Sequence, residues 1–196
     1  EINPERTTAS VIFSDLHLTK DNPTTKEIYV AFKKHPIPIE QGKSYDNKAV
    51  LIDSETQQMQ EIAAKAEALK AVPEAERPGK VLELFQSHVK YAYPDRIKEL
   101  AQTDPDLADW VTKNTGIDSP VGNEVPLSLI FEKGYAICRH LSVAYLWLAQ
   151  KAELEGTLLS GTVGENILRI DTGKKLFQSV NVGEPLKDFH DWVEIK

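Results

Sequence analysis

Two stretches in the first half of the chain place apolar residues at the spacing of a helix. The first begins at Ser54 with the letters SETQ, in which a serine and a glutamine three positions later form the pattern of a capping box. The second starts at Pro78, carries an apolar stripe as far as Ala92 and stops at YAYP, because proline disfavours helical geometry in the residue before it. The pattern predicts two amphipathic helices.

The middle of the chain predicts further helices, of which the last is apolar on every side. Residues 95–111 are expected to form one or two short helices capped by Thr103 or Asp104, and residues 112–125 a loop. The letters PLSLIF then predict a helical turn. After Cys138 comes a long apolar run, and a helix of that kind belongs in the centre of a protein.

Runs rich in β-forming residues dominate both ends of the chain. SVIF and EIYVAF predict one or two strands before an irregular arm. After Gly156, the runs GTLLSGTV, NILRID, KLFQSVNV and FHDWVEI predict successive strands, with DTGKK as a turn. We therefore predict an α+β fold in which helices from about residue 78 to 154 pack on a C-terminal antiparallel sheet. Residues 1–77 are expected to form an N-terminal extension of strands and one helix, and residues 78–196 the core.

Composition narrows the classes of function. The 30 acidic and 23 basic residues give a net charge of -7, and no basic cluster interleaved with aromatics could follow a phosphate backbone, so we expect no nucleic-acid partner. No run reaches the roughly 18 apolar residues of a membrane span, and residues 1–20 lack the features of a secretion signal. We expect a soluble protein, and the start at Glu1 indicates a processed chain. A single cysteine excludes an internal disulfide and leaves the compartment open.

The letters FSDLHL contain an Asp-x-His pair, Asp15 and His17, that resembles the opening metal-binding motif of metallophosphoesterases. A two-metal site needs further carboxylate, asparagine and histidine ligands, and the chain has neither the Gly-Asp nor the Gly-Asn-His step that usually supplies them. We therefore interpret this stretch as the end of a strand, with Asp15 as a cap and His17 half exposed.

Cys138 stands where a glycine-containing stretch gives way to the apolar helix, and a histidine near the end of the chain is its candidate partner. In FHDWVEI the period of a strand separates two faces. Phe189, Asp191, Val193 and Ile195 share one face, and His190, Trp192 and Glu194 share the other. If the second face lies against the start of the helix, imidazole meets thiol. The helix dipole and the adjacent Arg139 both lower the pKa of a thiol, which favours a thiolate nucleophile.

The ordered set of these motifs resembles the transglutaminase-like, papain-related superfamily. In that family a turn with glycine and cysteine opens the central helix, a serine-glycine pair follows in the next strand, and a His-x-Trp-x-Glu strand carries the base. This chain has GYAICRHLSVAYLWLAQ, then LLSG at 158–161, then HDWVEI, and VKYAYP resembles the family's lead-in. The resemblance runs from about residue 78 to the C-terminus. It implies that Cys138 is the nucleophile and His190 the general base and acid.

The chain also departs from the family pattern. The family has glycine two residues before the cysteine, whereas this chain has Ala136 there and Gly134 two positions further back. The strands between LLSG and HDWVEI indicate an inserted β-hairpin. The family's third residue is an aspartate or asparagine on the strand after the histidine strand, and this sequence ends at Lys196.

Three aspartates of the chain are candidates for the third position. Asp171 could orient His190 only with a permuted strand order, and Asp188 and Asp191 are too close along the chain to reach back to the ring. Either the orienting residue lies beyond Lys196 in a longer chain, or catalysis runs on a dyad, or the site is degenerate.

The resemblance implies a thiol-dependent acyl-transfer enzyme that acts on protein or peptide amides, as a cysteine peptidase, a deamidase or a transglutaminase. Attack by water or by an amine separates these activities, and neither needs a cofactor or a metal ion. The Cys138 amide is the first candidate for an oxyanion donor, with Trp110 or a glutamine as candidates for a second. The alternative is a non-catalytic binding module with the same fold. We expect His88 to be a core histidine with satisfied hydrogen bonds and His140 to be a surface or packing residue, and the oligomeric state stays open.

Overall fold

The computed structural model describes residues 9–11, 28–35, 38–46, 48–116, 123–164, 167–171, 177–181 and 188–195. For residues 9–11, 28–35, 160–164, 167–171, 177–181 and 188–192 it describes the backbone. The helices are α1 (Gln57–Ala68), the 3-10 helix η1 (Leu69–Ala71), α2 (Arg77–Gln86), α3 (Pro94–Thr103), α4 (Pro105–Thr115), α5 (Leu127–Lys133) and α6 (Cys138–Lys151). The strands are β1 (Ala9–Val11), β2 (Ile28–His35), β3 (Ser44–Tyr45), β4 (Val50–Leu51), β5 (Lys90–Tyr91), β6 (Val125–Pro126), β7 (Tyr135–Ala136), β8 (Gly156–Gly164), β9 (Ile167–Asp171), β10 (Phe177–Asn181) and β11 (Asp188–Ile195).

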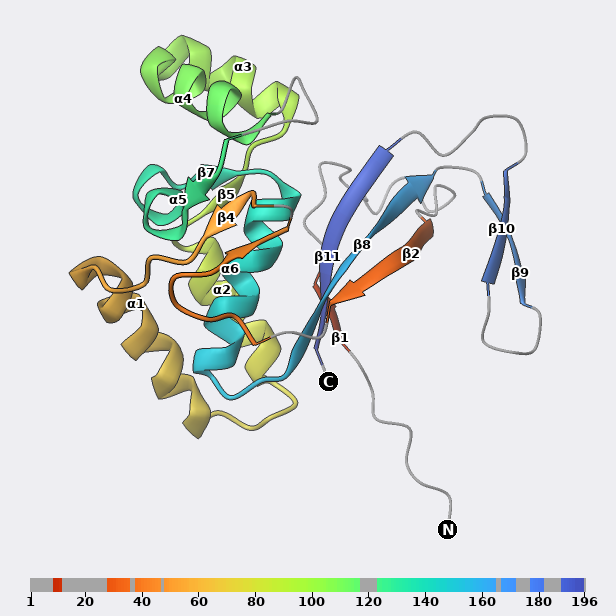
Figure 1. Cartoon of the computed structure of the whole chain (residues 1–196), viewed down its shortest axis with the longest axis horizontal. Coiled ribbons are helices and arrows are strands. Elements are labelled where there is room, and N and C mark those ends of the chain that lie inside the picture. The colour runs from red at the N-terminus through yellow and green to blue at the C-terminus, as the bar shows by residue number, and fades with distance from the viewer. Residues whose placement is uncertain are drawn as a thin grey trace.

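Helices gather in the middle of the chain and the long strands at its two ends, so the predicted α+β class is confirmed. In the described part of the chain a four-stranded sheet stands beside α6 (Figure 1). Its strand order is β1-β11-β8-β2, and each neighbouring pair is antiparallel. Two N-terminal strands therefore flank a centre made by two C-terminal strands.

Shorter pairings join segments that lie far apart in the sequence. β4 pairs with β3 in antiparallel and with β6 in parallel orientation. β5 pairs in parallel orientation with β7. β9 and β10 pair with each other in antiparallel orientation, as expected for the strands between LLSG and HDWVEI.

The predicted central helix α6 is confirmed as the middle of the core. Every residue from His140 to Ala149 is buried, and α1, α2, β8 and β11 pack around the helix. Burial of one large apolar side chain stabilises a fold by about 1.5–3 kcal/mol, so a helix with no polar face gains most in this position. Within the described ranges, no helix is both long enough and apolar enough to cross a bilayer.

Two predicted helix boundaries are wrong, each because of a specific contact. α1 begins after Thr56, whose hydroxyl accepts from the Met59 amide at 3.3 Å, while Ser54 bonds to the Gln41 side chain instead of capping the helix. α2 ends at Gln86 rather than near Ala92. Residues beyond it pair with β7, a distant strand that the local pattern does not reveal.

For the two helices predicted over residues 95–111, the predicted cap at their junction is confirmed and the predicted end is wrong. The Asp104 carboxylate accepts from the Leu107 amide at 3.1 Å, so Asp104 caps α4 as expected. α4 then continues to Thr115, into the segment predicted as a loop, and ends at Gly116, which has a left-handed backbone.

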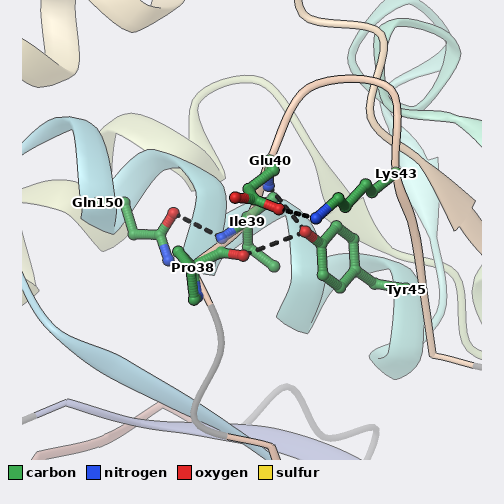
Figure 2. A network of polar contacts seen from close by, with 6 residues as sticks. All are labelled: Pro38, Ile39, Glu40, Lys43, Tyr45 and Gln150. Atoms are coloured by element: carbon green, nitrogen blue, oxygen red, sulfur yellow. Dashed lines mark hydrogen bonds and ion pairs between the residues drawn. The ribbon is translucent and has the colours of Figure 1, made fainter.

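The N-terminal arm, the described residues 38–56 before α1, is joined to the C-terminal half of α6 by a hydrogen bond, and further polar contacts lie within the arm (Figure 2). The Ile39 amide donates to Gln150 Oε1 at 2.9 Å. The Tyr45 hydroxyl accepts from the Glu40 amide at 2.8 Å and donates to the Pro38 carbonyl at 3.1 Å. Ile39 and Tyr45 belong to the same buried cluster as the residues of α6. The arm thus shares the core of the helical region, and the division of the chain into an extension and a core stays a prediction.

Candidate functional site

Cys138 is the first residue of α6, as the sequence predicted. Gly134 ends α5 in a left-handed conformation, φ 75°, and an added Cβ there would lie 3.1 Å from the His88 carbonyl oxygen. The chain then runs through β7 into the helix. N–H groups of a helix's first turn point out of the helix and favour negative charge, so this position suits a thiolate and an oxyanion. Cys138 is 9% exposed.

A pair of tyrosines stands beside the entry to α6. The Ala92 amide donates to the Ala136 carbonyl at 2.8 Å, and Tyr91 is in register with Ala136. The rings of Tyr91 and Tyr93 stack, with centroids 6.3 Å apart. Tyr91 thus lies beside the strand that leads into α6, and Tyr93 is the residue before α3. A local pattern gives no sign of this neighbourhood, because it arises from the pairing of β5 with β7.

The strand with the His-x-Trp-x-Glu motif runs alongside α6 in the same direction (Figure 1). α6 leads into β8 at Gly156, β8 returns toward the start of α6, and β11 is antiparallel to β8. A Cβ on Gly156 would lie 2.4 Å from Leu146 Cδ1 and 2.9 Å from Ile195 Cδ1. Leu146 in α6 and Ile195 in β11 are therefore at the same level along the shared axis of helix and strand. Cys138 is about 12 Å back from this level along the helix. Position 190 is about 16 Å back along the strand.

The C-terminal end of β11 packs on α6 through two apolar side chains. Val193 and Ile195 are buried in the cluster around α6, while Glu194 is half-buried. The register of β11 with β8 is unbroken from Asp188 to Ile195.

The side chains of His190 and Trp192 lie outside the described residues, so their pairing with Cys138 stays a prediction. The backbone of His190 is in register with Gly161, and Asp191 with Ser160. The serine-glycine pair of LLSG is thus the direct neighbour of the histidine on the adjacent strand.

Arg139, the residue after Cys138, has a charged neighbour from the N-terminal arm. Its Nε lies 3.9 Å from Oδ2 of Asp46, in the turn that follows β3. The Asp46 side chain is 10% exposed, and this oxygen has no hydrogen-bond partner among the described residues. Asp46 could not be found from the sequence, because a single aspartate in a turn is an ordinary turn residue.

His140 and His88 have different surroundings. His140 is buried, and neither ring nitrogen has a hydrogen-bond partner in the described part of the chain. Burial, and then the charge of Arg139, lower the pKa of His140 to about 3, so the ring is neutral at pH 7. His88 is half-buried beside Phe131, with ring centroids 6.1 Å apart, and burial lowers its pKa too.

The remaining candidates stay predictions. Asp15 and His17 lie outside the described residues. Trp110 lies beneath the Lys133 ammonium, 5.7 Å from the ring centroid, and its role as an oxyanion donor is untested. Among the residues whose side chains are described, no three His, Cys, Asp or Glu gather closely enough to hold a metal ion.

Comparison of the chain with models of protein families, with curated proteins and with solved structures finds no match. The resemblance to the transglutaminase-like superfamily therefore rests on the motifs of the chain itself.

Proposed function

We propose that the protein is a thiol-dependent acyl-transfer enzyme that acts on protein or peptide amides through Cys138 and His190. The observation that carries the proposal is the position of Cys138, at the start of a buried helix beside which the His-x-Trp-x-Glu strand runs in the same direction. Residues 78–196 would form its transglutaminase-like core. The common level at Gly156 supports the pairing, because it puts positions 138 and 190 within about one helical turn of each other along the shared axis.

In the proposed reaction, the Cys138 thiolate attacks the amide carbon and forms a C–S bond. Negative charge then develops on the oxygen, where N–H groups at the start of α6 stabilise it. The C–N bond breaks as the His190 imidazolium gives its proton to the departing amine. Water or a second amine next attacks the thioester, the imidazole accepts its proton, and the C–S bond breaks. Water gives peptidase or deamidase activity, and an amine gives a cross-link.

A non-catalytic binding module with the same fold is the second candidate. Two observations favour it. The residues of β11 that are buried against α6 are Val193 and Ile195, whereas Glu194 is only half-buried. Cys138 is also 9% exposed, which restricts the approach of a substrate.

Labelling of the single cysteine separates the two candidates. For the enzyme, iodoacetamide labels Cys138 in the native chain well below about pH 8, and His190→Ala removes that low-pH labelling because the imidazolium no longer stabilises the thiolate. His88→Ala is the matched control, a histidine change on another element, and leaves the low-pH labelling in place. A thiol that stays inert until the chain is unfolded identifies the module.

Casein then serves as a general amide substrate. Release of ammonia or new peptide ends indicates hydrolysis, whereas incorporation of an added amine indicates transfer, and Cys138→Ser abolishes each of them. Labelling at low pH that does not depend on His190 contradicts the proposed pair.

A further inference from the structure

The charge nearest to Cys138 along the chain, that of Arg139, is matched by an opposite charge from the N-terminal arm. The Arg139 side chain is 29% exposed, and its Nε is 3.9 Å from Asp46 Oδ2. That oxygen is buried and receives no hydrogen bond from the described residues. A buried carboxylate oxygen without a donor is costly, so attraction to the guanidinium is the interaction that offsets the cost.

Asp46 is held in place by the arm. It has a left-handed backbone, φ 55°, which aspartate and asparagine tolerate better than most residues. Its carbonyl accepts from the Ala49 amide at 3.1 Å and closes the turn between β3 and β4. Its neighbour Tyr45 is buried, and the Tyr45 hydroxyl bonds to Pro38 and Glu40 of the same arm (Figure 2).

Coulomb's law sets the sign of the effect on the thiol. A positive charge on Arg139 favours the thiolate of the neighbouring residue, and a negative charge on Asp46 opposes it. We propose that Asp46 is a positioning residue that neutralises Arg139 and so restrains the ionisation of Cys138. The inference rests on the proposed role of Cys138 as nucleophile, and it brings a residue from outside residues 78–196 to that site.

Other ionisable groups stand near Cys138 in the chain or in the strand pair that leads into α6. They are Arg139 and His140 in α6, Tyr135 in β7 and Tyr91 in β5, and Tyr93 and Arg96 follow β5 at the start of α3. The side chains of residues 188–192 in β11 lie outside the described residues. Tyrosine is neutral at pH 7, and the buried ring of His140 is neutral as well. Arg96 is paired with Glu99 at 3.5 Å. The substitutions at Asp46 are therefore repeated in the His190→Ala background, which removes the one group with a proposed proton-transfer role.

Ultraviolet absorbance of the thiolate measures the ionisation of Cys138 directly, with Cys138→Ser as the blank, because the chain has one cysteine. Asp46→Asn keeps the shape and the backbone preference of the residue. We expect it to lower the midpoint pH of thiolate formation by about 0.5–1 unit. Arg139→Gln raises the midpoint, and the double variant returns it close to that of the unaltered chain. Asp109→Asn is the control, since it removes the same charge from an exposed pair with Lys113.

Labelling rates give a second readout that a purely structural role would not change. Asp46→Asn removes the negative charge beside the guanidinium, so the rate with anionic iodoacetate rises several-fold relative to neutral iodoacetamide. A folded Asp46→Asn variant whose midpoint is unchanged or raised overturns the proposal. If that variant does not fold, Asp46→Gly, which suits the positive φ, takes its place and carries the same expectations.

The two proposals fail separately. If Asp46→Asn shifts the midpoint while His190→Ala changes neither the midpoint nor the labelling, the cysteine-histidine pair is wrong and the role of Asp46 holds. If His190→Ala removes the low-pH labelling and Asp46→Asn has no effect, the catalytic pair holds and the role of Asp46 is overturned.

Discussion

At the scale of single residues, His140 makes the stability of the protein depend on pH. The ring is buried, neither nitrogen has a partner among the described residues, and burial with the charge of Arg139 lowers its pKa from 6.5 to about 3. Below pH 6.5 the unfolded chain takes up a proton at this residue, and the native chain does not until about pH 3. The contribution of His140 to the free energy of unfolding is therefore fully present above pH 6.5 and is lost progressively as the pH falls toward about 3.

His140→Leu tests this dependence. Each pH unit between the two pKa values corresponds to about 1.4 kcal/mol, so the free energy of unfolding of the unaltered chain falls by about 2 kcal/mol more than that of the variant between neutral pH and about pH 5. At neutral pH the variant is as stable or more stable, because no polar atom is left without a partner. Urea unfolding at several pH values measures both. Parallel pH profiles for the two chains would show that His140 does not titrate in this way.

At the scale of elements, Arg77 joins the end of one helical segment to the end of another. Its guanidinium donates to the carbonyls of Lys70 and Val72 around η1 and to the carbonyl of Ala152 at the end of α6, at 3.1–3.3 Å. Arg77→Met keeps much of the apolar stem and removes these hydrogen bonds, and it should lower the free energy of unfolding by about 2–3 kcal/mol.

For the stability of the fold, the planar shape of the Arg77 guanidinium matters more than its charge. Arg77→Lys should recover only part of the loss, because one ammonium cannot reach carbonyls on both segments. Lys80→Met removes a cation from an exposed pair with Glu83 on the same helix and should change stability by less than about 0.5 kcal/mol. Urea unfolding that gives equal values for Arg77→Met and Lys80→Met contradicts the role of Arg77.

The elements also show which parts of the fold a local pattern could predict. α6 was predictable, because an apolar residue at nearly every position leaves a helix no place outside the core. The end of α2 was not predictable, because Lys90 and Ala92 donate to carbonyls of residues 134 and 136, more than forty positions away. The sequence pattern also could not show which residues of β11 pack on α6. A period of two defines which residues share a face, and the partner decides which face is buried.

At the scale of the whole molecule, the N-terminal arm joins the core through contacts that the sequence does not reveal. Ile39 is bound by Gln150, 111 positions later, and Val50 pairs with Val125. Such contacts decide the surroundings of Cys138 as well. The motifs predicted its place at the start of a buried helix, but contacts of distant segments bring Asp46 to Arg139 and Tyr91 to Ala136.

Gly156 sets how closely the sheet packs on α6, and the proposed site spans the sheet and that helix. A Cβ there would lie 2.4 Å from Leu146 Cδ1 and 2.9 Å from Ile195 Cδ1, so β8 and β11 must move away from α6 or both side chains must change rotamer. Gly156→Ala should therefore lower the free energy of unfolding by about 1–3 kcal/mol in urea. Gly79→Ala is the control, since an added Cβ meets no atom within 4 Å in helix α2 and should stabilise it by up to about 1 kcal/mol.

The same substitution tests whether the sheet carries the proposed pairing. If β11 brings His190 to Cys138, a shift of the strand away from α6 separates the two, and Gly156→Ala lowers the His190-dependent labelling of Cys138 in chains that remain folded. Gly79→Ala leaves that labelling unchanged, because α2 can gain stability without any movement of the sheet. Equal labelling in folded Gly156→Ala and in the unaltered chain would mean that the reactivity of the thiol does not depend on how the sheet packs on the helix.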